Sequence, residues 1–166
     1  TATDGRHSLS EMADAARRRG LRYLAITDHS RRLAMAKGLT ATRLSAQMDE
    51  IDRLNKDFTD IRLLKGIEVD ILEDGALDLP DDVLGRLDLV VGAVHSHFNL
   101  SKPKQTDRIL KAMDHPHFSI LAHPSGRLIG RREPYDVDMS RIIRKARERG
   151  CFLEVNAHRD RLDLTD

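Results

Sequence analysis

The stretch "AITDHS", residues 25–30, decides the fold, because an apolar run stops there at an acid and an imidazole. Ala25 and Ile26 end a short apolar segment, and Asp28 and His29 follow almost at once. Parallel sheets and barrels place their functional residues at the carboxyl ends of strands. If this stretch marks such an end, other strands of the chain are expected to end in the same way.

Short apolar runs alternate with helical periods along the whole chain. Strands are expected at 21–27, 61–72, 87–98, 118–123 and 151–158. Helices are expected at 8–19, from Thr40 within 38–58, at 105–115 and at 137–150, with a turn-rich segment at 73–80. Runs such as "DLVVGAV" show little alternation, which is typical of strands covered on both faces. This order favours an α/β fold with parallel strands joined by right-handed crossovers.

Composition indicates a globular chain of 166 residues with 33% charged residues and a net charge of +1. The even balance does not by itself indicate a nucleic-acid binder, although a local basic patch is compatible with it. Cys151 is the only cysteine, so no intrachain disulfide forms, and a reducing cytoplasm is the simplest setting. No stretch is long and apolar enough to span a membrane, and no signal peptide opens the chain.

Every expected strand delivers a histidine or a carboxylate at or near its carboxyl end. These ends carry Asp28, His29, Glu68, His95, His97, His123, Glu154, Asn156 and His158. In a barrel they would converge on one mouth. Each residue taken alone has an ordinary explanation, such as a partly exposed imidazole or a salt-bridge partner. Taken together, imidazoles mixed with carboxylates favour a divalent-metal site.

Other kinds of site fit the pattern less well. A structural zinc site rich in cysteine is excluded because Cys151 stands alone. A Ser-His-Asp hydrolase competes, but the chain has no Gly-x-Ser-x-Gly elbow. Metal ions close together can polarise a phosphoryl oxygen and activate water, which makes phosphoester chemistry a natural use of such a site.

Several stretches closely resemble the PHP (polymerase and histidinol phosphatase) family. They are "TDHS" (27–30), "GIEVDIL" (66–72), "VHSHFN" (94–99), "AHPSGRLIGRREPYDVD" (122–138) and "EVNAHRDRLDL" (154–164). The long block "HPSGRLIGRREPYDVD" resembles in particular the PHP domain at the carboxyl end of bacterial and archaeal family X DNA polymerases. The resemblance implies a distorted (β/α)7 TIM-like barrel with up to three Zn²⁺ or Mn²⁺ ions at the carboxyl ends of its strands.

The resemblance also implies roles for individual residues. The expected metal ligands are Asp4, His29, Glu68, His95 and His123. Glu68 is expected to bridge two ions and, with Asp28, to take part in catalysis. Asp28 is expected to orient an imidazole from behind the ligands, or else to cap a loop.

Phosphate binding is expected in the loop after His123. Arg127 and Arg131, and more weakly Arg132, are the residues expected to bind phosphate, because guanidinium groups match phosphate oxygens. The alternative is a solvated basic loop. Few aromatic residues lie nearby, so contacts to the nucleic-acid backbone are expected rather than base stacking.

The chain departs from the family pattern in three places. The family's first His-x-His pair precedes the segment that matches Asp4, and its last Asp-x-His motif follows one further strand; neither falls within residues 1–166. The chain is therefore expected to be one PHP domain truncated at both ends, a partial barrel without its first and last strands and without the polymerase region. Where the family often has His-Pro, this chain has His158-Arg159, so His158 is expected to be structural or substrate-facing.

The expected function is that of a metal-dependent phosphoesterase in a cytoplasmic DNA repair polymerase. It would act as a manganese-stimulated 3′-to-5′ exonuclease that processes DNA 3′ ends, with the polymerase domain in the same parent chain. The alternatives are a small-molecule phosphomonoesterase of the histidinol-phosphatase type and an inactive structural module. The 166 residues alone are expected to bind metal weakly and to show no measurable activity.

Overall fold

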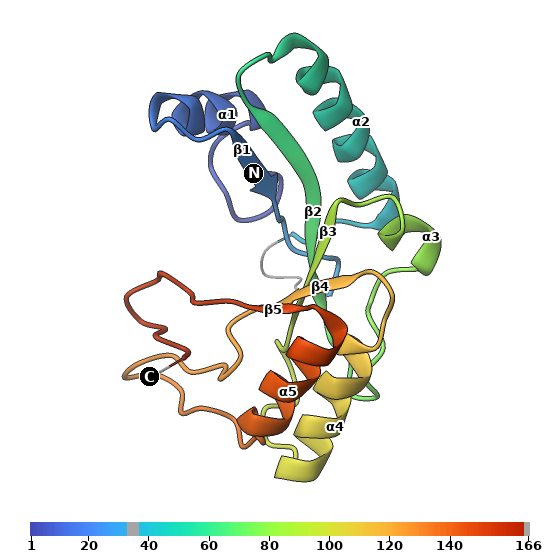
Figure 1. The fold of residues 1–166 in the computed structure, drawn as a ribbon, viewed down its shortest axis with the longest axis vertical. Coiled ribbons are helices and arrows are strands. Elements are labelled where there is room, and N and C mark those ends of the chain that lie inside the picture. The colour runs from blue at the N-terminus through green and yellow to red at the C-terminus, as the bar shows by residue number, and fades with distance from the viewer. Residues whose placement is uncertain (33–36, 165–166) are drawn as a thin grey trace. The chain divides into compact units, whose positions relative to one another are not determined.

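The structure is a computed structural model that describes residues 1–32 and 37–164 (Figure 1). The strands are β1 (Tyr23–Ile26), β2 (Arg62–Asp70), β3 (Leu89–Ala93), β4 (Phe118–Leu121) and β5 (Phe152–Leu153). The helices are α1 (Leu9–Arg18), α2 (Ala41–Asp57), α3 (Asp81–Leu84), α4 (Lys102–Met113) and α5 (Met139–Arg149). The order of strands and helices confirms the predicted α/β class.

The strands form a parallel sheet in the order β1-β2-β3-β4-β5. Tyr23 of β1 lies opposite Arg62 of β2, and Ile120 of β4 lies opposite Phe152 of β5. Each neighbour in the sheet is the next strand in the sequence, so every connection is a crossover that returns beside the strand it left. In each of the parallel pairs β1–β2 and β4–β5, the carboxyl ends of the two strands lie at the same edge.

Helix ends follow from capping residues in the sequence. Ser8 caps α1, since its hydroxyl accepts from the Glu11 N–H while the Glu11 side chain accepts from the Ser8 N–H. Thr40 caps α2 through its side chain, which accepts from the Arg43 N–H. Gly150 ends α5 at φ +69°, a conformation that costs glycine little.

The strands are shorter than predicted, and one helix was not predicted. β5 covers two residues of the expected 151–158, because its partner β4 ends at Leu121 and the last backbone bond runs from the Glu154 N–H to the Leu121 carbonyl. α3 begins directly after Pro80, the last residue of the segment 73–80 that was predicted to be turn-rich. Its four residues are too few to show a helical period in the sequence.

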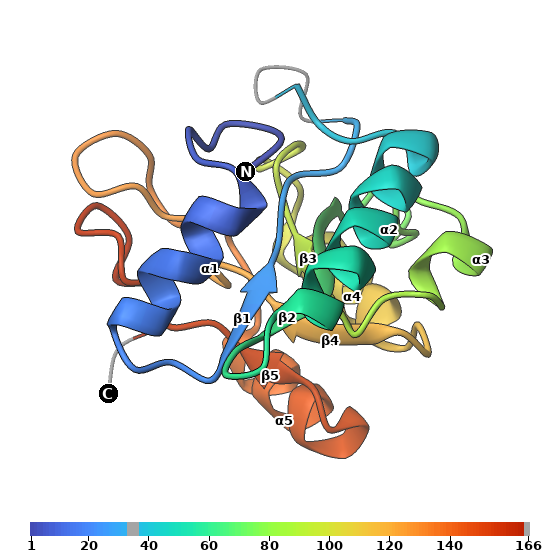
Figure 2. The same cartoon turned by 90° about the horizontal axis from the view of Figure 1, so that it is seen from above.

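The chain divides into two compact units. The N-terminal unit comprises Thr1–Glu68 and Leu79–Val90, and the C-terminal unit comprises Val69–Asp78 and Val91–Asp166. In the N-terminal unit, α1 and α2 lie beside β1 and β2 (Figure 2) and bury a cluster of apolar side chains. That cluster contains Leu9, Ala13, Ile26, Ile51, Leu54 and Leu63.

The C-terminal unit has a core of its own. Its helices α4 and α5 contact each other and β4 and β5 respectively. The buried core residues are Ile71, Val94, Ile109, Ala112, Met113, Phe118, Leu121, Tyr135, Ile142 and Ala146. Across both units, none of the helices in the described residues could cross a lipid bilayer.

Candidate metal centre

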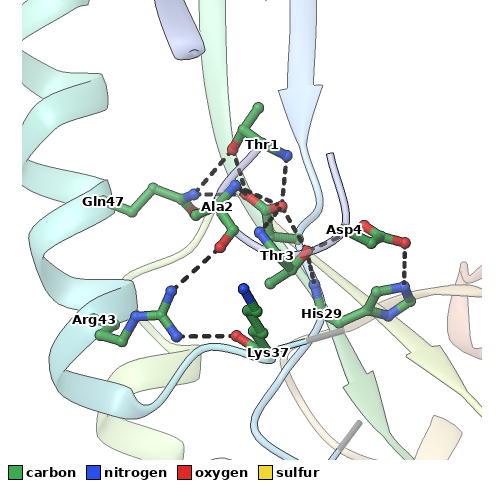
Figure 3. Close-up of polar contacts among 9 residues, drawn as sticks. Thr1, Ala2, Thr3, Asp4, His29, Lys37, Arg43 and Gln47 are labelled. Atoms are coloured by element: carbon green, nitrogen blue, oxygen red, sulfur yellow. Dashed lines mark hydrogen bonds and ion pairs between the residues drawn. The ribbon is translucent and has the colours of Figure 1, made fainter. Parts of the chain in front are cut away.

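In the N-terminal unit, His29 follows the end of β1 and lies between the carboxylates of Glu68, near the end of β2, and Asp4. The backbone brings His29 beside Glu68 through parallel bridging, in which the Glu68 N–H donates to the Asp28 carbonyl and the Ser30 N–H to the Glu68 carbonyl, both at 2.9 Å. His29 Nδ1 is 3.7 Å from Glu68 Oε1, and His29 Nε2 is 3.6 Å from Asp4 Oδ2 (Figure 3). Three of the predicted ligands therefore lie together.

The residue types in this cluster are ones that bind divalent metal ions, and Nδ1 of His29 faces Glu68 while its Nε2 faces Asp4, so one ion bound by this imidazole would be shared with one of the two carboxylates. The side chains of His29 and Glu68 are each 18% exposed, whereas that of Asp4 is 66% exposed. One imidazole and two carboxylates match the ligand preferences of zinc and manganese, and no thiolate is needed. His29 and Glu68 are thus largely shielded from solvent, whereas Asp4 is accessible to it.

Asp28 is buried behind this cluster and contacts the N-terminal segment. Its carboxylate accepts hydrogen bonds from the Thr1 hydroxyl and, at 2.7 Å, from Gln47 Nε2. Burial favours a higher pKa for Asp28, but these donors together with the Ala2 N–H outweigh it and hold the pKa of Asp28 well below its usual range. Asp28 is therefore an anion that accepts hydrogen bonds from residues 1–3 and from Gln47 of α2. It directly precedes His29 in the chain.

In the C-terminal unit, His95 and His123 lie close together at the ends of β3 and β4. Their ring centroids are 5.2 Å apart. Nδ1 of His95 contacts the carboxylate of Asp70, a residue of the stretch "GIEVDIL" for which no role was predicted. Residues two apart on a strand share a face, so the position of Asp70 relative to Glu68 was the signal that could have identified it.

The backbone at His123 adopts an uncommon conformation. Its φ is +29°, and its N–H donates to the Glu154 carboxylate at 2.7 Å while its carbonyl accepts from the Gly126 N–H at 2.8 Å. Non-glycine residues at positive φ carry a free-energy cost and gather at functional sites. The carboxylate of Glu154, which directly follows β5, thus holds the main chain at His123, one of the predicted ligands.

The arginines predicted to bind phosphate occupy different surroundings. Arg127 Nε donates to the Arg161 carbonyl at 3.1 Å, and Arg132 Nε donates to the Gly126 carbonyl at 2.8 Å. Arg132 therefore holds the main chain of its own loop, and Arg127 joins that loop to the main chain at Arg161. Arg131 is exposed. His158 is exposed as well, and its N–H donates to Asn156 Oδ1 at 2.9 Å.

The chain is similar in sequence to several known proteins. It is 49% identical over 164 residues to the "DNA polymerase/3'-5' exonuclease PolX" of Bacillus subtilis (strain 168), covering 99% of this chain and 29% of that protein. It is 30% identical over 152 residues to a "Probable phosphatase" of Syntrophotalea carbinolica and 29% identical over 153 residues to a "Probable phosphatase" of Thermoanaerobacter sp. (strain X514). Each of these two alignments covers 90% of this chain and 58% of the relative.

The family model for the PHP domain matches residues 1–158 of the 166. This match takes in the strand ends that carry His29, Glu68, His95 and His123, which confirms the resemblance seen in the sequence motifs. The chain belongs to the PHP domain family.

Proposed function

We propose that this chain is part of a metal-dependent phosphoesterase that acts as a 3′-to-5′ exonuclease on DNA ends within a family X DNA polymerase. The observation that carries the proposal is the 49% identity, along almost the whole chain, to a protein named for polymerase and 3′-to-5′ exonuclease activities. The probable phosphatases share 26% to 30% identity, which supports phosphoester chemistry in general and this more specific activity less.

The chain corresponds, in this proposal, to one PHP domain within a longer protein. The full domain would be a distorted (β/α)7 TIM-like barrel, to which the five strands of this chain contribute, with a first and a last strand outside residues 1–166. The chain spans 29% of the Bacillus subtilis PolX, which leaves room in such a protein for a polymerase domain and for the remaining ligands. Cytoplasmic DNA repair is the setting that suits such a protein.

Asp4, His29, Glu68, His95 and His123 would hold Zn²⁺ or Mn²⁺, up to three ions in the complete domain. Such ions supply a Lewis acid for the phosphoryl oxygens and lower the pKa of water that attacks phosphorus. The support from this chain is the pair of imidazole and carboxylate groupings, His29 with Asp4 and Glu68 in one unit, and His95 with Asp70 in the other.

The chain's own residues would orient the ligands and bind the substrate. Glu68, held by backbone bonds to the segment that carries His29, would present its carboxylate as the bridging ligand. Arg131, exposed in the loop after His123, would bind phosphate oxygens directly. Arg127 and Arg132 would support it by fixing the loop, and their remaining N–H groups would face the DNA backbone.

The test is to purify the full chain of a natural protein that contains this sequence and to measure metal content and hydrolysis. Metal ions per chain are counted by elemental analysis in the wild type, Glu68→Ala and His123→Ala, with the exposed Glu50→Ala and His117→Ala as matched controls. Hydrolysis is measured on a 5′-labelled DNA strand and on p-nitrophenyl phosphate, with and without Mn²⁺.

We expect two or three ions in the wild type and in both controls, fewer in the two ligand variants, and shortening of the DNA from its 3′ end that disappears with the metal. Faster turnover of p-nitrophenyl phosphate than of DNA would favour the small-molecule phosphatase instead. No bound metal in any version, even with added Mn²⁺, would refute both enzymes and leave a structural module.

A further inference from the structure

The segment Thr1–Asp4 lies beside His29 and Gln47 (Figure 3), and the buried carboxylate of Asp28 holds it there. Asp28, which is 4% exposed, accepts from the Ala2 N–H at 3.0 Å on each of its oxygens. It also accepts from the Thr3 N–H at 3.2 Å and from the Thr3 hydroxyl at 2.8 Å. Hydrogen bonds to a charged acceptor are stronger than neutral ones, so this carboxylate fixes the backbone of two consecutive residues.

Gln47 of α2 holds the same carboxylate from the other side. The amide is 7% exposed, and its Nε2 donates to Asp28 Oδ2 at 2.7 Å and to the Thr1 hydroxyl at 3.3 Å. Gln47 stands three residues after the buried Leu44 and four before the buried Ile51, where the helical period calls for an apolar side chain. Its Oε1 finds no hydrogen-bond partner among the described residues, so burying this amide costs free energy that a leucine would not cost. Such a residue is better explained by what it positions than by stability.

The network reaches the candidate ligands through Thr3. The Thr3 hydroxyl accepts from the His29 N–H at 3.4 Å, and Thr3 directly precedes Asp4. The Asp4 side chain is largely exposed, yet its Oδ2 lies 3.6 Å from His29 Nε2. One hydrogen-bonded unit thus fixes the main chain on both sides of the Asp4–His29 pair.

We propose that Asp28 and Gln47 are positioning residues that hold segment 1–4 in place, so that the Asp4 carboxylate and the His29 imidazole are presented together to one metal ion. The proposal rests on the proposed metal-dependent function. The sequence predicted that Asp28 orients the imidazole directly. In this proposal Asp28 instead acts by holding the backbone of residues 1–3.

The experiment compares Gln47→Leu and Thr3→Val with Asn55→Leu in the full chain. Asn55 is a matched control, since it is a second partly buried amide on α2 and its two 2.8 Å hydrogen bonds go to the Leu63 backbone, away from segment 1–4. Three quantities are measured: hydrogen exchange of the Ala2 and Thr3 amides without metal, Mn²⁺ affinity by titration, and melting temperature.

We expect Gln47→Leu and Thr3→Val to speed the exchange of the two amides about 10-fold. Mn²⁺ affinity should fall about 10- to 100-fold in both variants, the range typical for residues that orient metal ligands. Asn55→Leu should lower the melting temperature and leave amide exchange in segment 1–4 and Mn²⁺ affinity as in the wild type.

Unchanged Mn²⁺ affinity in Gln47→Leu would overturn the proposal, whether or not exchange becomes faster. If Gln47→Leu does not fold, Thr3→Val decides the question in the same way, because it removes one hydroxyl from a partly exposed residue. An Asp4→Asn variant separates the two proposals. If it binds Mn²⁺ as the wild type does, the assignment of Asp4 as a ligand fails, while the exchange rates still report whether Asp28 and Gln47 hold the segment.

Discussion

Replacing Arg108 with methionine is expected to destabilise the C-terminal unit by about 3 kcal/mol. Arg108 lies on α4, is 2% exposed, and directs its guanidinium group at main-chain carbonyls. Nε donates to the Leu72 carbonyl and Nη1 to the Ser96 carbonyl, each at 3.0 Å, and Nη2 donates to the Ile71 carbonyl. Ile71 and Leu72 directly follow β2, and Ser96 lies three residues after the end of β3, so one side chain joins the segments that follow the two strands.

The magnitude follows from these three bonds and from the cost of burying the cation. A hydrogen bond to a charged group contributes about 1.5 kcal/mol at the low end, so three contribute about 4.5 kcal/mol. Burial lowers the pKa of Arg108, which shows that the buried charge is disfavoured, and an apolar methionine recovers about 1.5 kcal/mol of that cost. The remaining loss of about 3 kcal/mol lowers the melting temperature by about 6–12 °C in a chain of this size.

The assay is urea unfolding followed by circular dichroism, with Arg141→Met as the control. Arg141 of α5 pairs with Asp107 at 3.1 Å, but its side chain is 44% exposed, so its loss should cost about 0.5 kcal/mol. A loss below about 1 kcal/mol for Arg108→Met, or a loss equal to that of Arg141→Met, would refute this assignment of the three bonds.

Three further predictions concern packing, reactivity and pH. In Gly92→Ala the new Cβ would lie 2.2 Å from a ring carbon of the buried Phe118, so urea unfolding should show a loss of about 1–3 kcal/mol, and no loss would contradict this packing. Burial raises the pKa of the Cys151 thiol, so iodoacetamide at pH 7.5 should modify it more slowly than it modifies glutathione; an equal rate would contradict the burial. The pKa of Asp28 is lowered, because its hydrogen bonds outweigh its burial, so its stabilisation is complete above the unfolded pKa of about 3.9 and is lost as the pH falls through the lower folded value. The difference in stability between wild type and Asp28→Asn should therefore be largest near pH 6 and shrink steadily as the pH falls below about 4, and a constant difference would be evidence against the prediction.

The order of strands and helices could be predicted because most elements show their period over several residues. The spacing of Leu44, Met48 and Ile51 identified α2, and each was found buried on one face of it. The limits of the strands could not be predicted in this way, because a strand ends where its partner ends rather than where its own apolar pattern stops. β5 shows this most clearly, because a strand was predicted over the eight residues 151–158 and only Phe152 and Leu153 form it.

The candidate site was predictable in part, for a related reason. His29 and Glu68 could be placed together because parallel strands bring their carboxyl ends to one edge, and the structure places the two residues side by side. The partners of Asp28 could not be predicted, because its hydrogen bonds join it to Thr3, 25 residues earlier, and to Gln47, 19 residues later. No periodicity within one element reports on such contacts.

The sequence nevertheless contains a sign of these supporting residues. Gln47 and Arg108 both occupy positions where the helical period calls for an apolar side chain, and both are buried. Each one donates to groups next to strand ends that carry candidate ligands: Gln47 to Asp28, beside His29, and Arg108 to the carbonyl of Ser96, which directly follows His95. Burying a polar side chain costs free energy, so a polar residue on the buried face of a helix is expected to have a specific hydrogen-bond partner. Gln47 donates to the Asp28 carboxylate, and Arg108 donates to main-chain carbonyls that follow two strands. A buried polar residue on an otherwise apolar helix face is therefore the sequence feature that indicates the residues supporting the candidate ligands.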